Sequence, residues 1–168
     1  MQAWSTTPAM LLACEMLFYF SAFRRITTDT RSAFLFPHFV QKSFLDKILL
    51  DFPELNIIAA HLGHGWERQL NSMAVFKFNL MTDISARQLI ASQNYDEFCH
   101  ILRSALDDFG PQRVLFGTDG PMVNPIMRTK DYLQLIKELP DKAPSDIAFT
   151  KEEVDAMLGQ SAFSLLCS

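Results

Sequence analysis

Residues 56–62 read NIIAAHL, a short apolar run that ends around His61 and is followed at once by Gly63 and Gly65. Unbroken apolar runs of this length are typical of strands that are covered on both faces, as in parallel sheets. The sequence therefore predicts a buried strand with a histidine at its carboxyl end.

The segments on either side of this run have helical spacing. Upstream, apolar residues recur with the helical period from Phe39 to Phe52, and Pro53 ends the predicted helix. Downstream, residues 66–75 show the same spacing. The strand is thus expected to alternate with helices along the chain.

Three more apolar runs have the length of buried strands. They are PAMLLAC at residues 8–14, FNLMTDI at 78–84 and RVLFGT at 113–118. Between 14 and 39 the pattern is mixed, and the polar segment TTDTR at 27–31 indicates a loop. We expect four strands in all.

Two of the later helices have recognisable starts. Asn94 is an N-cap with Glu97 three residues on, and Thr150 with Glu153 repeats this pattern at the start of a terminal helix. Residues 128–138 form a further helix between them. Strands that alternate with helices favour an α/β fold with parallel strands and right-handed crossovers.

Length and composition predict a single soluble domain over residues 1–168, because 49% of the residues are hydrophobic and 20% are charged. A net charge of -4 without a Lys or Arg block argues against nucleic acid as a partner. The apolar run 9–23 is shorter than the roughly 20 residues of a membrane span and contains Glu15, so no membrane span is expected. Three widely spaced cysteines without a CxxC pair fit a reducing, cytoplasmic location.

Two polar residues follow the predicted strands where ligands bind in parallel α/β folds. His61 ends the first run, and Asp119 follows RVLFGT between Gly117 and Gly120. An imidazole can bind a metal or transfer a proton, and a carboxylate can do the same. Structural roles stay open for both, since Asp119 could cap the turn at Pro121 and His61 could be a hydrogen-bonded core histidine.

Two further residues are weaker candidates for the site. His64 shares the glycine-rich loop with His61, so it could share a metal with it or be exposed to solvent. Arg128 could bind a substrate carboxylate or remain a solvated helix residue.

The motifs FPELNIIAAHLGHGW, FNLMTDIS, RVLFGTDGP and TKEEVDAMLGQSAFSLL, taken in this order, resemble the amidohydrolase-related family over residues 37–166. That family includes metal-dependent hydrolases, lactonases and the decarboxylases related to aminocarboxymuconate semialdehyde decarboxylase. The resemblance is to the second half of the family's TIM barrel. It implies a partial, C-terminal half barrel of about four parallel strands, numbers five to eight of the family.

The resemblance also implies roles for individual residues. Asp119 matches the aspartate after the eighth strand, which binds the metal and handles the proton of its water. His61 matches the histidine after the sixth strand, which acts on the substrate or binds a second metal. Residues 8–14 would be the fifth strand, with Cys14 or a neighbour in place of a metal-binding histidine, and the HxH pair of the first strand is missing.

The expected function is that of a metal-dependent hydrolase, in which water on a divalent metal, with zinc as the first choice, attacks the carbonyl of an amide, ester or lactone. The expected substrate is a small carbonyl or carboxylated molecule. Decarboxylation by the same family site, and a catalytically inactive remnant or scaffold, are the alternatives. Because four parallel strands leave two open edges, a homo-oligomer is also predicted.

Overall fold

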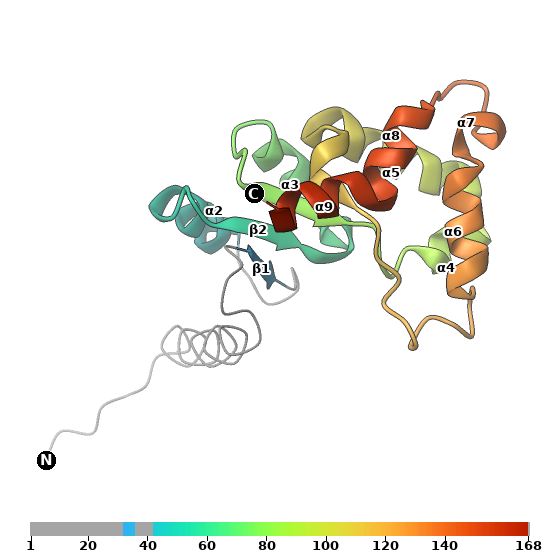
Figure 1. Cartoon of the computed structure of the whole chain (residues 1–168), viewed down its shortest axis with the longest axis horizontal. Helices are drawn as coiled ribbons and strands as arrows, with labels where there is room; N and C mark the ends of the chain where they lie inside the picture. The colour runs from blue at the N-terminus through green and yellow to red at the C-terminus, as the bar shows by residue number, and fades with distance from the viewer. Residues whose placement is uncertain (1–31, 36–41, 168) are drawn as a thin grey trace, which may run out of the picture.

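The computed structural model describes residues 32–35 and 42–167 and contains one parallel four-stranded sheet (Figure 1). The strands are neighbours in the order in which they occur along the chain, so each crossover leads to the adjacent strand. This confirms the predicted α/β class with parallel strands alternating with helices. The strands are β1 (Ser32–Leu35), β2 (Asn56–Ala59), β3 (Leu80–Asp83) and β4 (Val114–Leu115).

The strand beside β2 is not the one predicted. The sequence assigned this place to residues 8–14, which lie outside the described residues, whereas β1 pairs with β2 from Ser32 opposite Asn56 onward. Since β3 occupies the other side of β2, both hydrogen-bonding edges of β2 are taken, and the assignment of residues 8–14 to this place is wrong. The four-residue run of β1 carried too little pattern to be recognised.

The strands are also shorter than their apolar runs. The run 56–62 continues past β2 into a tight turn at Ala60–Gly63, and 113–118 is paired only at Val114–Leu115. Apolar residues report burial, and burial extends beyond the last ladder hydrogen bond. His61 therefore lies in the turn after β2 and not at the end of the strand itself.

The predicted helices are present with slightly different ends, except that the terminal helix, predicted to run to Leu166, is interrupted by a π-helical segment at Ala156–Gln160. Asn94 accepts a hydrogen bond from the backbone N–H of Glu97, and Thr150 and Glu153 form the predicted reciprocal capping box. Two short helices, α4 and α7, were not predicted. The helices are α2 (Lys42–Asp51), α3 (Glu67–Ala74), α4 (Gln88–Gln93), α5 (Tyr95–Phe109), α6 (Thr129–Lys137), α7 (Leu139–Lys142), α8 (Lys151–Asp155) and α9 (Ser161–Cys167).

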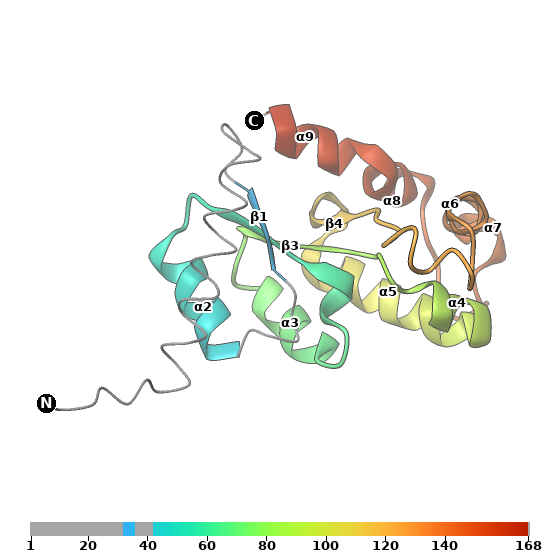
Figure 2. The same cartoon turned by 90° about the horizontal axis from the view of Figure 1, so that it is seen from below.

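Helices cover both faces of the sheet, with α2 and α3 on one side and α9 on the other (Figure 2). Consecutive strand residues point to opposite faces, so the two faces contribute to different apolar clusters. The larger cluster contains Ile57, Leu80 and Val114 together with residues of α2, α3, α5 and α6. The smaller cluster contains Ile58, Met81 and Leu115, against which Ala162 and Leu165 of α9 pack.

Within the described ranges, no helix has both the length and the apolar character needed to cross a membrane.

Tyr132 of α6 ties the helical layer to the loop after β3. Its side chain is fully buried, its ring stacks on Phe116 with 5.7 Å between centroids, and its hydroxyl donates to the Ile84 carbonyl at 2.7 Å. Burial raises the pKa of Tyr132, so the hydroxyl keeps the proton that it donates.

We predict that Tyr132→Phe lowers the free energy of unfolding by about 1–3 kcal/mol, because the buried Ile84 carbonyl loses its donor while the ring packing is kept. Denaturant unfolding measures the change. Tyr95→Phe is the matched control, since Tyr95 is only half-buried and the partner of its hydroxyl is the weakly bonding thiol of Cys99. Equal losses in the two variants would contradict this role of Tyr132.

Candidate active site

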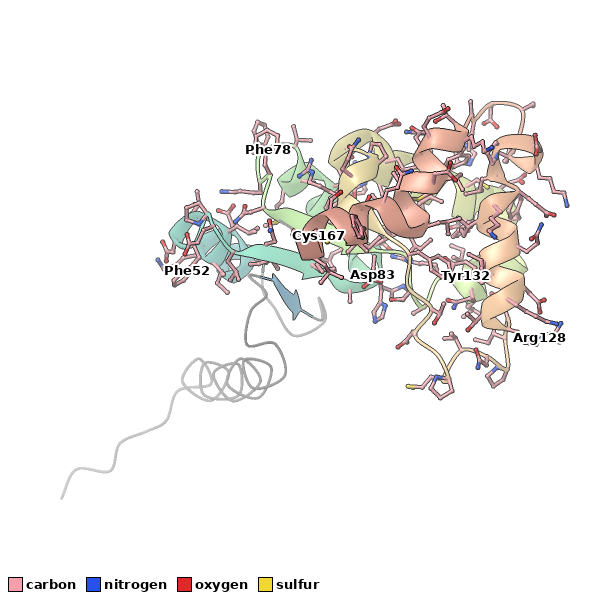
Figure 3. The ribbon with its side chains drawn as sticks, in the orientation of Figure 1. Phe52, Phe78, Asp83, Arg128, Tyr132 and Cys167 are labelled. Atoms are coloured by element: carbon pink, nitrogen blue, oxygen red, sulfur yellow. The ribbon has the colours of Figure 1, made fainter. Side chains whose placement is uncertain are left out.

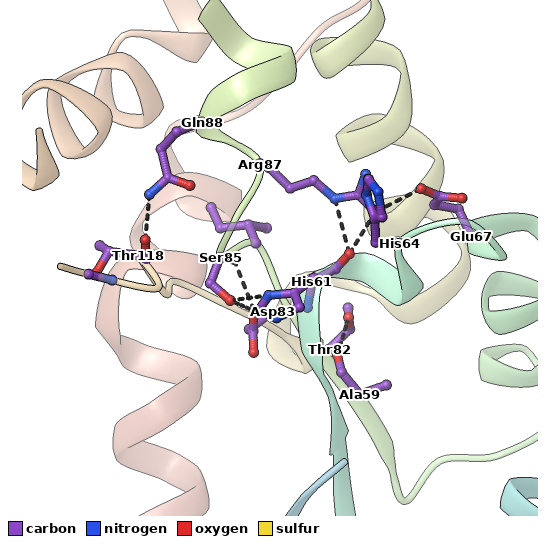
Figure 4. Close-up of polar contacts among 12 residues, drawn as sticks. Ala59, His61, His64, Glu67, Thr82, Asp83, Ser85, Arg87, Gln88 and Thr118 are labelled. Carbon is purple, nitrogen blue, oxygen red and sulfur yellow. Dashed lines mark hydrogen bonds and ion pairs between the residues drawn. The ribbon is translucent and has the colours of Figure 1, made fainter. Parts of the chain in front are cut away.

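Three loops meet at the carboxyl edge of the sheet, one each after β2, β3 and β4 (Figure 4). The first carries His61, the second follows Asp83, and the third contains Thr118 and Asp119. From the sequence, we expected parallel strands to bring the loops of His61 and Asp119 to one edge of the sheet. The parallel strand order agrees with this expectation. The β3 loop lies between the other two because β3 lies between β2 and β4.

The backbone at His61 is held in a left-handed turn. His61 has φ 61° and Leu62 has φ 49°, a region that costs side-chain-bearing residues about 1–3 kcal/mol each. The His61 N–H donates to Asp83 Oδ1 at 3.1 Å, and the His61 carbonyl accepts from Arg87 Nε at 3.0 Å and Nη2 at 2.6 Å. The backbone N–H and carbonyl of His61 are thus fixed by Asp83, the last residue of β3, and by Arg87, which follows it.

The His61 side chain contacts the same loop. Its Nδ1 lies 2.8 Å from Ser85 Oγ and 3.9 Å from Asp83 Oδ1. The Ser85 hydroxyl in turn is hydrogen-bonded to Asp83 Oδ1, and the Ser85 N–H donates to that oxygen at 2.9 Å. Asp83 and Ser85 are only 7% and 6% exposed, so this chain of contacts is largely shielded from water, which strengthens it.

Arg87 is buried although it is charged. It is 3% exposed, pairs with Glu67 Oε1 at 2.8 Å, and has Nη1 3.3 Å from His64 Nδ1. Burial by itself would raise the pKa of Glu67, but backbone hydrogen bonds and the Arg87 guanidinium lower it below its ordinary value. Glu67 therefore stays ionised and balances the charge of the buried arginine.

The loop after β4 is tied to the same segment. A Cβ atom at Gly117 would lie 3.0 Å from Cβ of Ser85, so glycine permits this close approach. The residue after Arg87 is Gln88, the first residue of α4, and its Nε2 donates to the Thr118 carbonyl at 2.6 Å. Two adjacent residues at the start of α4 therefore hold the loops of His61 and Asp119.

Asp119 itself is exposed and has a left-handed backbone, φ 51°. No hydrogen bond or ion pair of its carboxylate occurs within the described part of the chain, so the structure does not support the alternative role of Asp119 as a cap. An exposed carboxylate at the sheet edge is available to a substrate or a cation.

The other residues named from the sequence lie elsewhere or have structural partners. Arg128 is exposed, forms a two-point ion pair with Asp131 at 2.6 and 3.2 Å, and lies well away from Asp83 (Figure 3). His64 is exposed and contacts Arg87. Cys14 lies outside the described residues.

Four residues of the site were not recognised from the sequence. They are Asp83, Ser85, Arg87 and Gln88. Asp83 and Ser85 do follow an apolar run, and polar residues in that position are a usable signal. Arg87 and Gln88 carry no such signal, because charged and amide residues at a helix start are usually exposed.

The residues present do not by themselves complete a metal site. His61 and Asp119 offer the nitrogen and oxygen donors that zinc accepts, but catalytic zinc usually has three protein ligands. No group of three or more His, Cys, Asp or Glu residues that could hold a metal ion occurs in the regions that the structure describes.

A parallel sheet with polar residues gathered beyond the carboxyl ends of its strands is the arrangement of α/β-barrel enzymes. The sequence model of the amidohydrolase family matches residues 37–166, which is more than half of the chain. The chain belongs to the amidohydrolase family.

Solved structures agree on the fold. A TIM-barrel protein from Bordetella bronchiseptica is 20% identical with TM-score 0.59, and the match covers 90% of this chain and 50% of that one. An amidohydrolase from Burkholderia multivorans with bound zinc is 16% identical with TM-score 0.57, covering 81% and 51%. Amidohydrolase 2 from Bifidobacterium longum subsp. infantis is 20% identical with TM-score 0.55, and the match covers 79% of this chain and 48% of that one.

The match thus spans about half of the length of each of these proteins. Together with the four parallel strands, this confirms the predicted partial TIM barrel. No protein of curated function matches the sequence significantly.

We predict that Glu67→Gln lowers the free energy of unfolding at neutral pH by about 1–2 kcal/mol, because the amide keeps an acceptor for Arg87 but removes the compensating charge. Thermal unfolding compared with the exposed control Glu54→Gln measures this effect.

The same pair makes the difference depend on pH. Because the folded pKa of Glu67 lies below the ordinary 4.5, its contribution is fully present above pH 4.5 and is lost as pH falls through the folded pKa. The gap between the wild type and Glu67→Gln should therefore shrink on acidification. A gap that grows in acid would show that the Glu67 charge does not stabilise the fold.

Proposed function

We propose that this protein hydrolyses the bond between the carbonyl carbon and the nitrogen or oxygen of a small amide, ester or lactone, at the carboxyl edge of its sheet. The observation that carries the proposal is that three polar side chains hold His61. Asp83 accepts from its N–H, Arg87 donates to its carbonyl, and Ser85 contacts its ring. Structural cores rarely need an imidazole held in a strained turn by buried polar groups, whereas catalysis does.

Hydrolysis needs one group to take a proton from water and one to return a proton to the leaving atom. His61 and Asp119 are the two titratable groups that the loops after β2 and β4 bring to the site. As the attacking water loses its proton, its oxygen forms the new bond to the carbonyl carbon. The leaving oxygen or nitrogen then takes up a proton as the old bond breaks.

We also propose that the site binds a divalent metal, and zinc is our first choice. The zinc bound by the Burkholderia multivorans amidohydrolase supports it. When bound, such a metal would polarise the carbonyl or acidify the water. Asp119 would supply one ligand of this metal, while His61 would act on the water.

We predict that His61→Gln lowers kcat/KM for the best substrate in a panel of amides, esters and lactones by on the order of 10²- to 10⁴-fold. His100→Gln is the matched control, because His100 lies on the exposed surface of α5 with Asp96 and Asp146 as partners. Release of carbon dioxide from carboxylated substrates would instead identify a decarboxylase. If the wild type turns over no substrate in the panel, the result favours the alternative that the protein is a catalytically inactive remnant or scaffold.

We predict that Asp119→Asn lowers the molar content of bound zinc after metal reconstitution, because the amide is a weaker ligand than the carboxylate. Elemental analysis by mass spectrometry measures it, and Asp155→Asn, an exposed position on α8, is the control. Equal zinc content in wild type and Asp119→Asn would remove Asp119 from the metal site.

A further inference from the structure

The Ser85 hydroxyl stands between two groups that compete for its single proton. Its oxygen is hydrogen-bonded to Asp83 Oδ1 and lies 2.8 Å from His61 Nδ1. A hydroxyl can donate only one hydrogen bond, while its oxygen can accept others. The direction of one contact therefore fixes the direction of the other.

The direction at Asp83 follows from its other partners. Asp83 Oδ1 accepts from the N–H groups of His61 at 3.1 Å and of Ser85 at 2.9 Å. An oxygen that already receives two donors acts as an acceptor, and a proton on it would point at those N–H groups. The Ser85 hydroxyl must then donate to Asp83.

From this we infer that Ser85 and Asp83 are positioning residues that hold neutral His61 in the tautomer with its hydrogen on Nδ1. With its proton engaged by Asp83, Ser85 Oγ can only accept from the ring, so Nδ1 must carry a hydrogen. The other tautomer would set the Nδ1 lone pair against the hydroxyl lone pairs at 2.8 Å. That arrangement is repulsive.

The surroundings leave little room for a different arrangement. Ser85 and Asp83 are buried, and Gly117 packs against Ser85 so closely that a Cβ there would come within 3.0 Å of Ser85 Cβ. Arg87 fixes the His61 carbonyl from the other side. Both the backbone and the ring of His61 are thus held with respect to Ser85.

The tautomer decides which ring nitrogen of His61 can accept a proton. What this means for the reaction rests on the proposed function. With the hydrogen on Nδ1, the basic nitrogen of neutral His61 is Nε2, so in the proposed reaction Nε2 would be the atom that takes the proton from water. The water oxygen bonds to the carbonyl carbon as its O–H bond breaks and the proton passes to Nε2. The imidazolium that results has the Asp83 carboxylate 3.9 Å from Nδ1, which stabilises it.

Nitrogen-15 NMR of the histidine rings tests the inference directly, in full-length protein with and without chelator, at a pH where the rings are neutral. We expect wild-type His61 to carry its hydrogen on Nδ1. In Ser85→Ala the ratio of the Nδ1–H to the Nε2–H form should fall by roughly five- to tenfold, which corresponds to the loss of one hydrogen bond. Ser92→Ala, an exposed serine of α4, should change nothing.

Ser85→Thr retains the hydroxyl and should restore the Nδ1–H form. The inference is overturned if wild-type His61 is protonated on Nε2, or if Ser85→Ala keeps the wild-type ratio while its circular dichroism shows a folded protein. Because the readout needs neither substrate nor metal, the tautomer can be established even if no hydrolysis is found. Conversely, the wild type could hydrolyse a substrate while His61 carries its hydrogen on Nε2. That result would support the proposed function but contradict this role of Ser85.

Discussion

The arrangement of the site depends on hydrogen bonds that leave the start of α4 in opposite directions (Figure 4). Arg87 and Gln88 are neighbours in sequence, yet Arg87 binds the carbonyl of His61 and Gln88 binds the carbonyl of Thr118. Both acceptors are backbone groups, so the loops after β2 and β4 are located by their main chains. The hydrogen bonds that Arg87 and Gln88 make therefore do not use the side chains of His61 and Asp119.

The side chains that hold these loops are buried polar groups. Burial of a polar group is unfavourable unless it has a hydrogen-bond or ion-pair partner. Arg87 illustrates how this is met, since Glu67 balances its charge and the His61 carbonyl takes two of its N–H groups. The left-handed backbone of His61 and Leu62 adds strain that only a well-supported turn can sustain. Rigid support of this kind is what a preorganised group requires.

The two faces of the sheet connect the site to the rest of the molecule. In a closed barrel one face of each strand points to an interior filled by side chains. Here the face with Ile58, Met81 and Leu115 packs against α9, while the other face is covered by α2, α3 and α5. The strands are thus enclosed on both sides, and their carboxyl ends carry the polar loops.

Sequence alone determined the elements whose signals are local. The capping residues Asn94 and Thr150, the apolar runs of β2, β3 and β4, and the positions of His61 and Asp119 after two of these runs could all be predicted, because periodicity and capping act within a few residues. Strand β1 could not, because its four residues form a strand through pairing with β2. Likewise, Ser85 lies 24 residues from His61, and Gln88 lies 30 from Thr118. Contacts at such separations exist only once the sheet has brought the loops together, so the tertiary structure alone decided which polar residues hold the site.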